Sequence, residues 1–159
     1  MIPEIELYTD GSCPVPHQAG GWAYILRIVP SGTERRASGG EKITTNNRME
    51  LMGVIVGLKQ LPVKCRVKIV SDSQYVVYGI SKWLPKWKKA NWIKKNYETK
   101  KKEPVANSDL WKELDALLSK HIVTAEWIKG HSGHTENEWC DLASGLETKK
   151  LVELAAQHV

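Results

Sequence analysis

The chain has 159 residues, a length typical of one domain, and its 42% hydrophobic and 26% charged residues match a folded globular protein. This composition excludes a fibrous or intrinsically disordered chain. The sequence has no apolar stretch long enough to span a membrane, and its first residues lack the basic and apolar regions of a secretory signal. A cytoplasmic protein without a membrane segment is therefore expected.

The net charge of +5 is concentrated in one segment. Residues 82–102, here called the basic segment, hold nine lysines and a single acid, Glu98, so the rest of the chain is slightly acidic. Such a segment predicts affinity for a polyanion. Cys13, Cys65 and Cys140 are odd in number and lack metal-ligand spacing, which predicts neither a disulfide framework nor a zinc module and is typical of a reducing compartment.

The first half of the chain predicts three strands and a helix. Residues 5–10 read as a strand that ends in an Asp-Gly turn, and residues 20–29 and 34–43 read as two strands joined by a hairpin. The three strands together indicate an antiparallel meander. From residue 46 to 61 the apolar residues follow a helical spacing, which ends at a proline.

The second half alternates strands with helices. It predicts strands at 65–72 and 122–128 and helices at 72–80 and 108–120, with a further helix that starts near Thr135. Residues 146–159 read as a short additional helix of unknown role. Hairpin strands followed by alternating helices and strands predict a mixed sheet flanked by helices, within one α/β domain over residues 1–159.

Four acids stand close to the ends of these predicted elements, and each has an ordinary interpretation. Asp10 belongs to a common turn dipeptide, and Asp72 or its neighbour Ser73 can cap the helix that follows. Glu50 can form a capping box with Asn47, while Asp141 is an acid near a helix N-terminus.

The combination of these acids indicates more than their separate roles. Asp10 and Asp72 both follow apolar strands, and parallel neighbouring strands would place their carboxylates at one edge of the sheet. Two carboxylates about 4 Å apart repel by roughly 4 kcal/mol at an effective dielectric constant of 20. Such a cluster needs protons, cationic side chains or a metal ion, and oxygen ligands suit Mg²⁺ or Mn²⁺. A pair of these ions can promote phosphodiester cleavage.

Five segments resemble the successive motifs of bacterial type 1 ribonuclease H. They are YTDGSC, TTNNRMEL, VSDSQYV, NSDLW and IKGHSGHTENEWCD, and the similarity runs in the family's order from residue 4 to 145. The resemblance implies a ribonuclease H-like fold, with a five-stranded sheet of three antiparallel and then two parallel strands. It also implies an endonuclease that hydrolyses the RNA strand of RNA–DNA hybrids without sequence preference and acts as a monomer.

By the same resemblance, Asp10, Glu50, Asp72 and Asp141 would hold two Mg²⁺ ions, for which Mn²⁺ could substitute. The products would carry 5′-phosphate and 3′-hydroxyl ends. His131 would assist proton transfer or product release, because an imidazole suits proton transfer near neutral pH. Without the resemblance, His131 reads as a surface histidine between small residues.

The resemblance further assigns substrate contacts. It places Asn46, Asn47, Gln74 and the backbone of Gly11, Ser12 and Cys13 against the RNA minor groove, where 2′-hydroxyls distinguish RNA. Thr45 and Asn107 would hold a phosphate of the DNA strand. Residues 44–47 alone would be interpreted as a loop that enters a helix.

The basic segment resembles the handle that many members of this family carry. Trp83 and Trp87 are four residues apart and would contact sugars of the DNA strand, while Lys86, Lys88 and Lys89 would neutralise phosphates. The alternative is a solvated charged helix whose tryptophans pack into the body of the protein.

The chain departs from the family pattern in residues 14–19, which read PVPHQA and lack the asparagine that commonly contacts the minor groove there. His17 and Gln18 are the candidate replacements.

Two other functions compete with hybrid cleavage. A DNA nuclease of the same fold would require another substrate-recognition surface or additional DNA-binding domains. A module that binds hybrids or double-stranded RNA without catalysis would not need all four acids.

Overall fold

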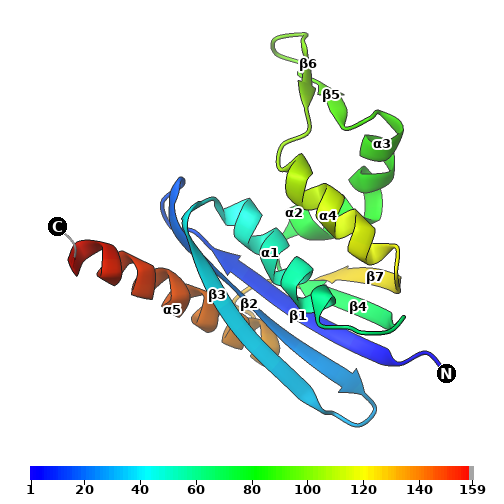
Figure 1. Ribbon diagram of the computed structural model, residues 1–159, viewed down its shortest axis with the longest axis vertical. Coiled ribbons are helices and arrows are strands. Elements are labelled where there is room, and N and C mark those ends of the chain that lie inside the picture. Colours follow the sequence, from blue (N-terminus) through cyan, green and yellow to red (C-terminus); the bar gives the residue numbers. More distant parts are fainter. Residues whose placement is uncertain (158–159) are drawn as a thin grey trace.

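A mixed five-stranded sheet forms the centre of the molecule in the computed structural model, which describes residues 1–157 (Figure 1). Its strands are β1 (Glu4–Ser12), β2 (Gln18–Val29), β3 (Glu34–Thr44), β4 (Arg66–Ser71) and β7 (Ile122–Trp127). They lie in the order β3-β2-β1-β4-β7. Neighbouring strands are antiparallel from β3 to β1 and parallel from β1 to β7. The predicted α/β class and the arrangement of three antiparallel and two parallel strands are confirmed.

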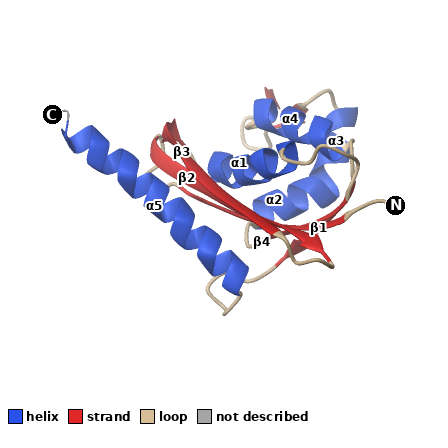
Figure 2. Cartoon of the chain, turned by 60° about the horizontal axis from the view of Figure 1, so that its bottom comes forward, coloured by secondary structure: helices blue, strands red, loops and turns tan. Residues whose placement is uncertain are grey.

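Helices cover both faces of this sheet (Figure 2). The helical elements are α1 (Asn46–Lys59), α2 (Gln74–Tyr78), the π-helical turn η1 (Gly79–Trp83), α3 (Leu84–Lys89), α4 (Ser108–Leu118) and α5 (Thr135–Gln157). α1, α2 and α4 lie on one side of the sheet, and α5 lies on the other. None of the helices within residues 1–157 is long and apolar enough to cross a membrane.

Two hydrophobic clusters hold these layers together. The main core lies between the sheet and the α1 side, where Leu7, Ile55 and Trp111 are fully buried. A smaller cluster of Ile25 and Cys140, together with Ala23, joins the sheet to α5. Complete burial of a large apolar side chain stabilises the fold by about 1.5–3 kcal/mol. The position of the central strand β1 is thus fixed by packing on both faces of the sheet.

The C-terminal helix is longer than the sequence predicted. Residues 146–159 were expected to form a separate short helix, but α5 continues without a break as far as Gln157, and residues 158–159 lie outside the described part. This part of the prediction is wrong, because residues 146–157 contain neither proline nor glycine and consist mostly of good helix formers. The buried Thr148 on this part of α5 shows that the helix still packs on the body there.

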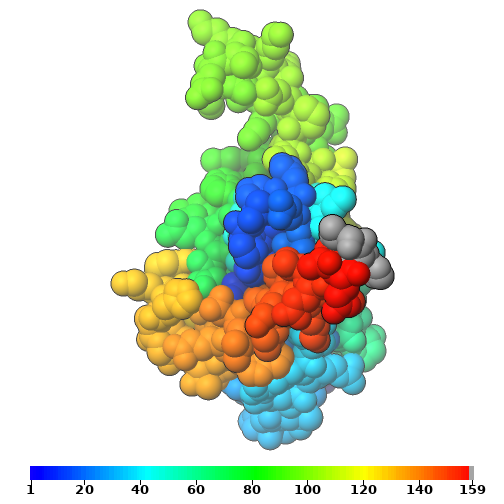
Figure 3. Space-filling view, turned by 90° about the vertical axis from the view of Figure 1, so that its left-hand side faces the viewer, coloured from blue at the N-terminus to red at the C-terminus, as the bar shows by residue number. Residues whose placement is uncertain are grey.

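The basic segment projects from the rest of the molecule (Figure 3). It begins in η1 and α3 and then forms a hairpin of β5 (Ile93–Lys95) and β6 (Lys102–Pro104). This second sheet was not predicted from the sequence, because strands of three residues are too short to show alternation. The projecting part therefore ends slightly beyond residue 102, the limit predicted for the basic segment.

Candidate active site

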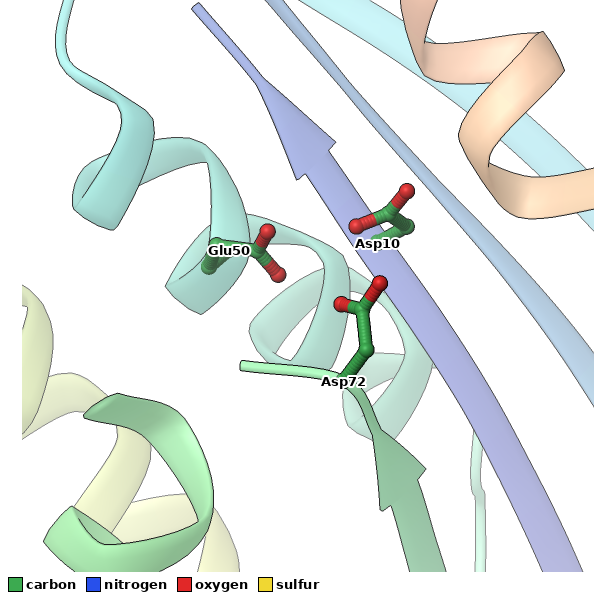
Figure 4. A group of neighbouring side chains, drawn as sticks. All are labelled: Asp10, Glu50 and Asp72. Atoms are coloured by element: carbon green, nitrogen blue, oxygen red, sulfur yellow. The ribbon is translucent and has the colours of Figure 1, made fainter. Parts of the chain in front are cut away.

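Three carboxylates converge where β1 and β4 end (Figure 4). Asp10 lies near the end of β1, Asp72 follows β4 directly, and Glu50 reaches them from α1. One oxygen of each carboxylate lies within 4.8 Å of the others. Because β1 and β4 are parallel neighbours, Asp10 and Asp72 lie at the same edge of the sheet, as the sequence predicted.

Other residues cap the two helices next to these acids. Thr45 caps α1, where its hydroxyl accepts a hydrogen bond from the backbone N–H of Arg48, and Ser73 caps α2. The interpretation of Asp72 as a helix cap is therefore wrong, and so is the capping box of Asn47 and Glu50. Glu50 stands beyond the first turn of α1, which contains no acid. Neither carboxylate is needed to terminate a helix.

Close contact between two backbones places Glu50 beside Asp10. Gly11 packs so tightly on α1 that a Cβ atom there would overlap the backbone nitrogen of Glu50. Only glycine permits this approach. The Asp10-Gly11 pair therefore does more than form a turn, since it brings β1 and α1 together at the carboxylates.

Burial and mutual repulsion disfavour negative charge in this cluster. Asp10 is 3% exposed, and its burial, followed by the charge of Asp72, raises its pKa to about 8. The pKa of Glu50 is also raised, first by burial and then by the charges of Asp10 and Asp72. The apo protein therefore holds protons here that a free carboxylate would lose.

The donor set fits a hard divalent cation. The Oε2 atom of Glu50 is buried and lacks a hydrogen-bond partner within the described residues, an arrangement that costs free energy unless a cation is bound. All the candidate ligand atoms are carboxylate oxygens, which Mg²⁺ and Mn²⁺ prefer. Asp10, Glu50 and Asp72 thus meet the requirements of a magnesium site.

Two residues that sequence reasoning missed position Asp72. The indole N–H of Trp127, at the end of the edge strand β7, donates to the backbone carbonyl of Asp72 at 2.9 Å. Gly130 lies against the carboxylate, where a Cβ atom would stand 2.6 Å from Oδ2 of Asp72. The sequence offered only a weak signal: Trp127 directly precedes the motif that contains His131, and Gly130 lies within that motif.

Asp141 and His131 lie beside the cluster rather than within it. Asp141 stands in the second turn of α5, is half-buried, and contributes to the raised pKa of Asp10. Its Oδ2 atom is 4.0 Å from Nδ1 of His131. His131 is exposed, has a positive φ of 54°, and lies in the loop between β7 and α5. The three-carboxylate group of the described residues does not include Asp141.

The predicted minor-groove residues surround the carboxylate edge. Asn46 and Asn47 are exposed in the first turn of α1, and Gln74 is exposed at the start of α2. Gly11 is buried, and the thiol of Cys13 turns inward and donates to the carbonyl of Thr44 at 3.5 Å. Ser12 is half-buried at the end of β1. Of these three residues, only Ser12 is partly exposed to a ligand.

A hydrogen-bond network orders the predicted phosphate pocket. Asn107 adopts a left-handed conformation (φ 58°) and donates to the hydroxyl of Tyr75 at 3.1 Å. Arg48 donates to Oδ1 of Asn107 at 3.3 Å and forms a bidentate pair with Asp109. Arg48, which also contacts Thr45 through its backbone, was missed by the sequence analysis. It places a cation next to both predicted pocket residues.

The tryptophans of the basic segment pack on one another and on the main core. The ring centroid of Trp87 lies 5.9 Å from that of Trp83 and 5.1 Å from that of the buried Trp111. This packing supports the alternative that these rings belong to the body, although Trp83 and Trp87 are only half-buried. Lys86 and Lys89 are exposed, and Lys88 is exposed but paired with Asp115 at 3.2 Å. Contact of these residues with DNA stays a prediction.

Comparison with known proteins identifies the family. The profile of the RNase H family matches residues 3–148. The chain is 48% identical to Ribonuclease H of Aeromonas salmonicida, over 92% of this chain and 94% of that protein. It is 50% identical to Ribonuclease HI of Neisseria meningitidis, over 89% and 92% of the two chains.

A solved structure supports the same assignment. The crystal structure of LC9-RNase H1, described as a type 1 RNase H with the type 2 active-site motif, superimposes with a TM-score of 0.82 at 27% identity. The match covers 95% of this chain and 74% of that chain. Family profile, sequence relatives, fold and carboxylate site agree, and the chain belongs to the ribonuclease H family of enzymes, among its bacterial type 1 members.

Proposed function

We propose that this protein is an endonuclease that hydrolyses the RNA strand of RNA–DNA hybrids with the help of two divalent cations, with Mg²⁺ as the natural ion. The observation that carries the proposal is the convergence of Asp10, Glu50 and Asp72 at the edge of the sheet, with a buried oxygen of Glu50 left without a partner. Family membership supplies the reaction class.

Four carboxylates would coordinate the two ions. Asp10, Glu50 and Asp72 form the convergent group, and Asp141 would complete it from α5. When bound, such ions activate a water nucleophile and stabilise the leaving oxygen of a phosphodiester. The proposed products carry 5′-phosphate and 3′-hydroxyl ends.

The remaining roles fall to residues around this group. The exposed imidazole of His131, on a loop next to Asp141, can carry a proton between the reacting phosphate and solvent or assist product departure. Asn46, Asn47 and Gln74 offer amide groups to the 2′-hydroxyls of the RNA strand. Thr45, Asn107 and the adjacent Arg48 would hold a DNA phosphate.

The proposed partner is the hybrid duplex alone, and the enzyme is proposed to act as a monomer in the cytoplasm. The exposed lysines of the basic segment support sequence-independent binding, because contacts with phosphates carry no sequence information.

A gel assay of one labelled RNA strand tests the proposal. The strand is presented alone, paired with RNA and paired with DNA, each with Mg²⁺ and with chelator. Cuts that appear only in the hybrid and only with metal are expected. Asp10→Asn serves as the matched control and should still bind the hybrid while it cleaves at least roughly 10⁴-fold more slowly, as when a member of a catalytic set is removed.

Other outcomes would favour the competing functions. Binding by the wild-type protein without any cuts would favour a non-catalytic module, and cleavage of a DNA strand would favour a DNA nuclease. Undiminished cleavage by Asp10→Asn would refute the assignment of the metal ligands.

A further inference from the structure

We infer that the tip of the basic segment binds an unpaired nucleotide next to the hybrid, by stacking a base on Tyr97. The site consists of β5, β6 and the turn between them, residues 93–104, here called the tip hairpin. The inference rests on the proposed hybrid substrate and deepens it, because it assigns a single-stranded extension of that substrate to a surface away from the carboxylates.

The first observation is an unpartnered aromatic ring. Tyr97 is 88% exposed and, within residues 1–157, contacts neither another aromatic ring nor a cation. The other aromatic rings of the basic segment are already packed against other side chains. Trp83, Trp87 and Trp92 pack in sequence, and Lys112 lies over Trp92 at 5.6 Å. Tyr97 is therefore the free stacking surface of this segment.

The second observation is an excess of positive charge in the same hairpin, which contains five lysines and two acids, Glu98 and Glu103, the latter opposite Lys94. Five lysines belong to the tip hairpin, and none of them has an ion-pair partner in the described part of the chain: Lys94, Lys95, Lys100, Lys101 and Lys102. Lys95 and Lys102 are direct cross-strand partners, an arrangement that destabilises a hairpin through repulsion. The acid of β6, Glu103, accepts a hydrogen bond from Asn96 instead. A phosphate bound between the lysines would remove this repulsion.

The third observation is that the turn is ordered. The side-chain oxygen of Asn96 accepts hydrogen bonds from the backbone N–H groups of Glu98 and Thr99 at 2.9 and 3.2 Å. The backbone N–H of Asn96 donates to the carbonyl of Lys101 at 2.8 Å, and Lys100 takes a left-handed conformation. These bonds present Tyr97 outward on a defined loop. The backbone that carries Tyr97 is thus already in place before a ligand arrives, which lowers the entropic cost of binding.

These features together favour an unpaired base as the ligand. Inside a duplex both faces of a base are covered by its neighbours, so an exposed ring can stack only on a base that is unpaired or at an end. Single-strand binding proteins combine such aromatic surfaces with lysines that follow the backbone, and one stacked base contributes enough affinity to be measured. The tip hairpin has both components within twelve residues, counted from Ile93 to Pro104.

Binding to matched hybrids tests the inference. Fluorescence anisotropy is measured in chelator, which prevents cleavage, with one hybrid sequence that is either blunt or carries a short unpaired DNA extension at one end or the other. The wild-type protein should bind at least one extended form about fivefold or more tightly than the blunt form. Tyr97→Ala should abolish this preference and leave blunt binding unchanged. Tyr97→Phe, which keeps the ring, should retain the preference.

Two results would overturn the inference. One is equal affinity of the wild-type protein for blunt and extended hybrids. The other is a loss of blunt affinity in Tyr97→Ala as large as the loss of extended affinity, which would mean that the ring contacts the duplex. Because Tyr97 is exposed, the variant should keep the wild-type Tm, and its cleavage of blunt hybrid in Mg²⁺ should also be unchanged. Failure of wild-type cleavage would refute the proposed function separately, since the binding assay contains no metal.

Discussion

At the scale of single residues, the main feature is a group of carboxyl side chains that are buried and repel one another at one edge of the sheet. Asp10 and Glu50 are buried beside each other and beside Asp72, and an oxygen of Glu50 has no partner among the described residues. Such an arrangement costs folding free energy in the apo protein and is relieved by a cation. A divalent cation bound by these carboxylates would remove this cost, so metal binding should stabilise the fold.

This arrangement predicts how stability depends on pH. The pKa of Asp10 is 3.8 in a free carboxyl and about 8 in the fold. Between these values the folded protein binds more protons than the unfolded chain, so the free energy of unfolding falls as pH rises. In chelator, the Tm of the wild-type protein should therefore fall between about pH 5 and about pH 8, and Asp10→Asn should show a smaller fall.

Thermal unfolding followed by circular dichroism at both pH values measures this difference. His121, whose pKa is lowered by burial, acts in the opposite direction over part of this range, but it is present in both proteins and cancels in the comparison. Mg²⁺ should raise the Tm more at the higher pH. Parallel pH profiles of the two proteins would refute the raised pKa of Asp10.

Gly130 offers a second test at the scale of one residue. A Cβ atom at this position would stand 2.6 Å from the Asp72 carboxylate, so Gly130→Ala must displace that side chain or the loop. We expect a loss of kcat of about tenfold or more and a higher Mg²⁺ concentration at half-maximal activity, with the affinity for hybrid in chelator unchanged.

Gly133→Ala is a control for Gly130→Ala in the same loop. Gly133 has open space around its Cα but a positive φ of 86°, so the substitution strains the loop without touching Asp72. If both variants raised the Mg²⁺ requirement equally, loop strain rather than contact with Asp72 would be the cause.

At the scale of elements, the basic segment is joined to the body through aromatic packing. Trp87 in α3 contacts Trp111 in α4, and Trp111 is fully buried in the main core. The packing of Trp111 also requires Gly79 in η1, where a Cβ atom would overlap the ring. The tryptophans of the basic segment thus hold it in a fixed orientation on the body.

Trp87→Ala should therefore reduce stability as well as binding. Because Trp87 is half-buried, we expect a loss of about 2–3 kcal/mol in the free energy of unfolding, somewhat below the cost of removing a fully buried tryptophan. Urea denaturation checks the value. The exposed Tyr97 supplies the control, since Tyr97→Ala should leave the urea midpoint unchanged. An unchanged midpoint for Trp87→Ala would mean that the ring contributes nothing to the stability of the fold.

At the scale of the whole molecule, charge is divided between a slightly acidic body and the projecting basic segment (Figure 3). This separation keeps strong positive charge away from the buried carboxylates and exposes it to a polyanion. We therefore expect affinity for the proposed hybrid to depend strongly on the basic segment, which carries the excess of positive charge.

The dependence of binding on salt tests this division. Each lysine that contacts a phosphate contributes about 0.7–0.9 to the slope of log affinity against log salt concentration. Lys86→Ser together with Lys89→Ser should therefore reduce the slope by about 1.5, as measured by anisotropy with blunt hybrid in chelator. Lys59→Ser is a suitable control, because Lys59 lies outside the basic segment and pairs with Glu113 at 2.5 Å. Equal slopes for both sets would show that the basic segment does not bind the duplex.

The sequence by itself determined where the strands lie along the chain and the edge of the sheet at which Asp10 and Asp72 meet. Alternation and helical spacing are local patterns, and they placed all five strands of the main sheet and the helices of the body close to their observed positions. Asp10 lies near the end of β1 and Asp72 directly follows β4, and because these strands are parallel neighbours, the proximity of the two acids follows from topology. The motifs of residues 4–145 were sufficient to name the family.

Only the tertiary structure decided which polar atoms lack a hydrogen-bond partner, which side chains are exposed and which are packed against others. The unpartnered oxygen of Glu50, the contact of Gly130 with Asp72 and the exposure of Tyr97 each depend on residues far apart in the chain or on the shape of a turn. The packing of Trp87 on Trp111 is of the same kind. Local patterns cannot report them, because burial and partnership arise only when distant segments pack together.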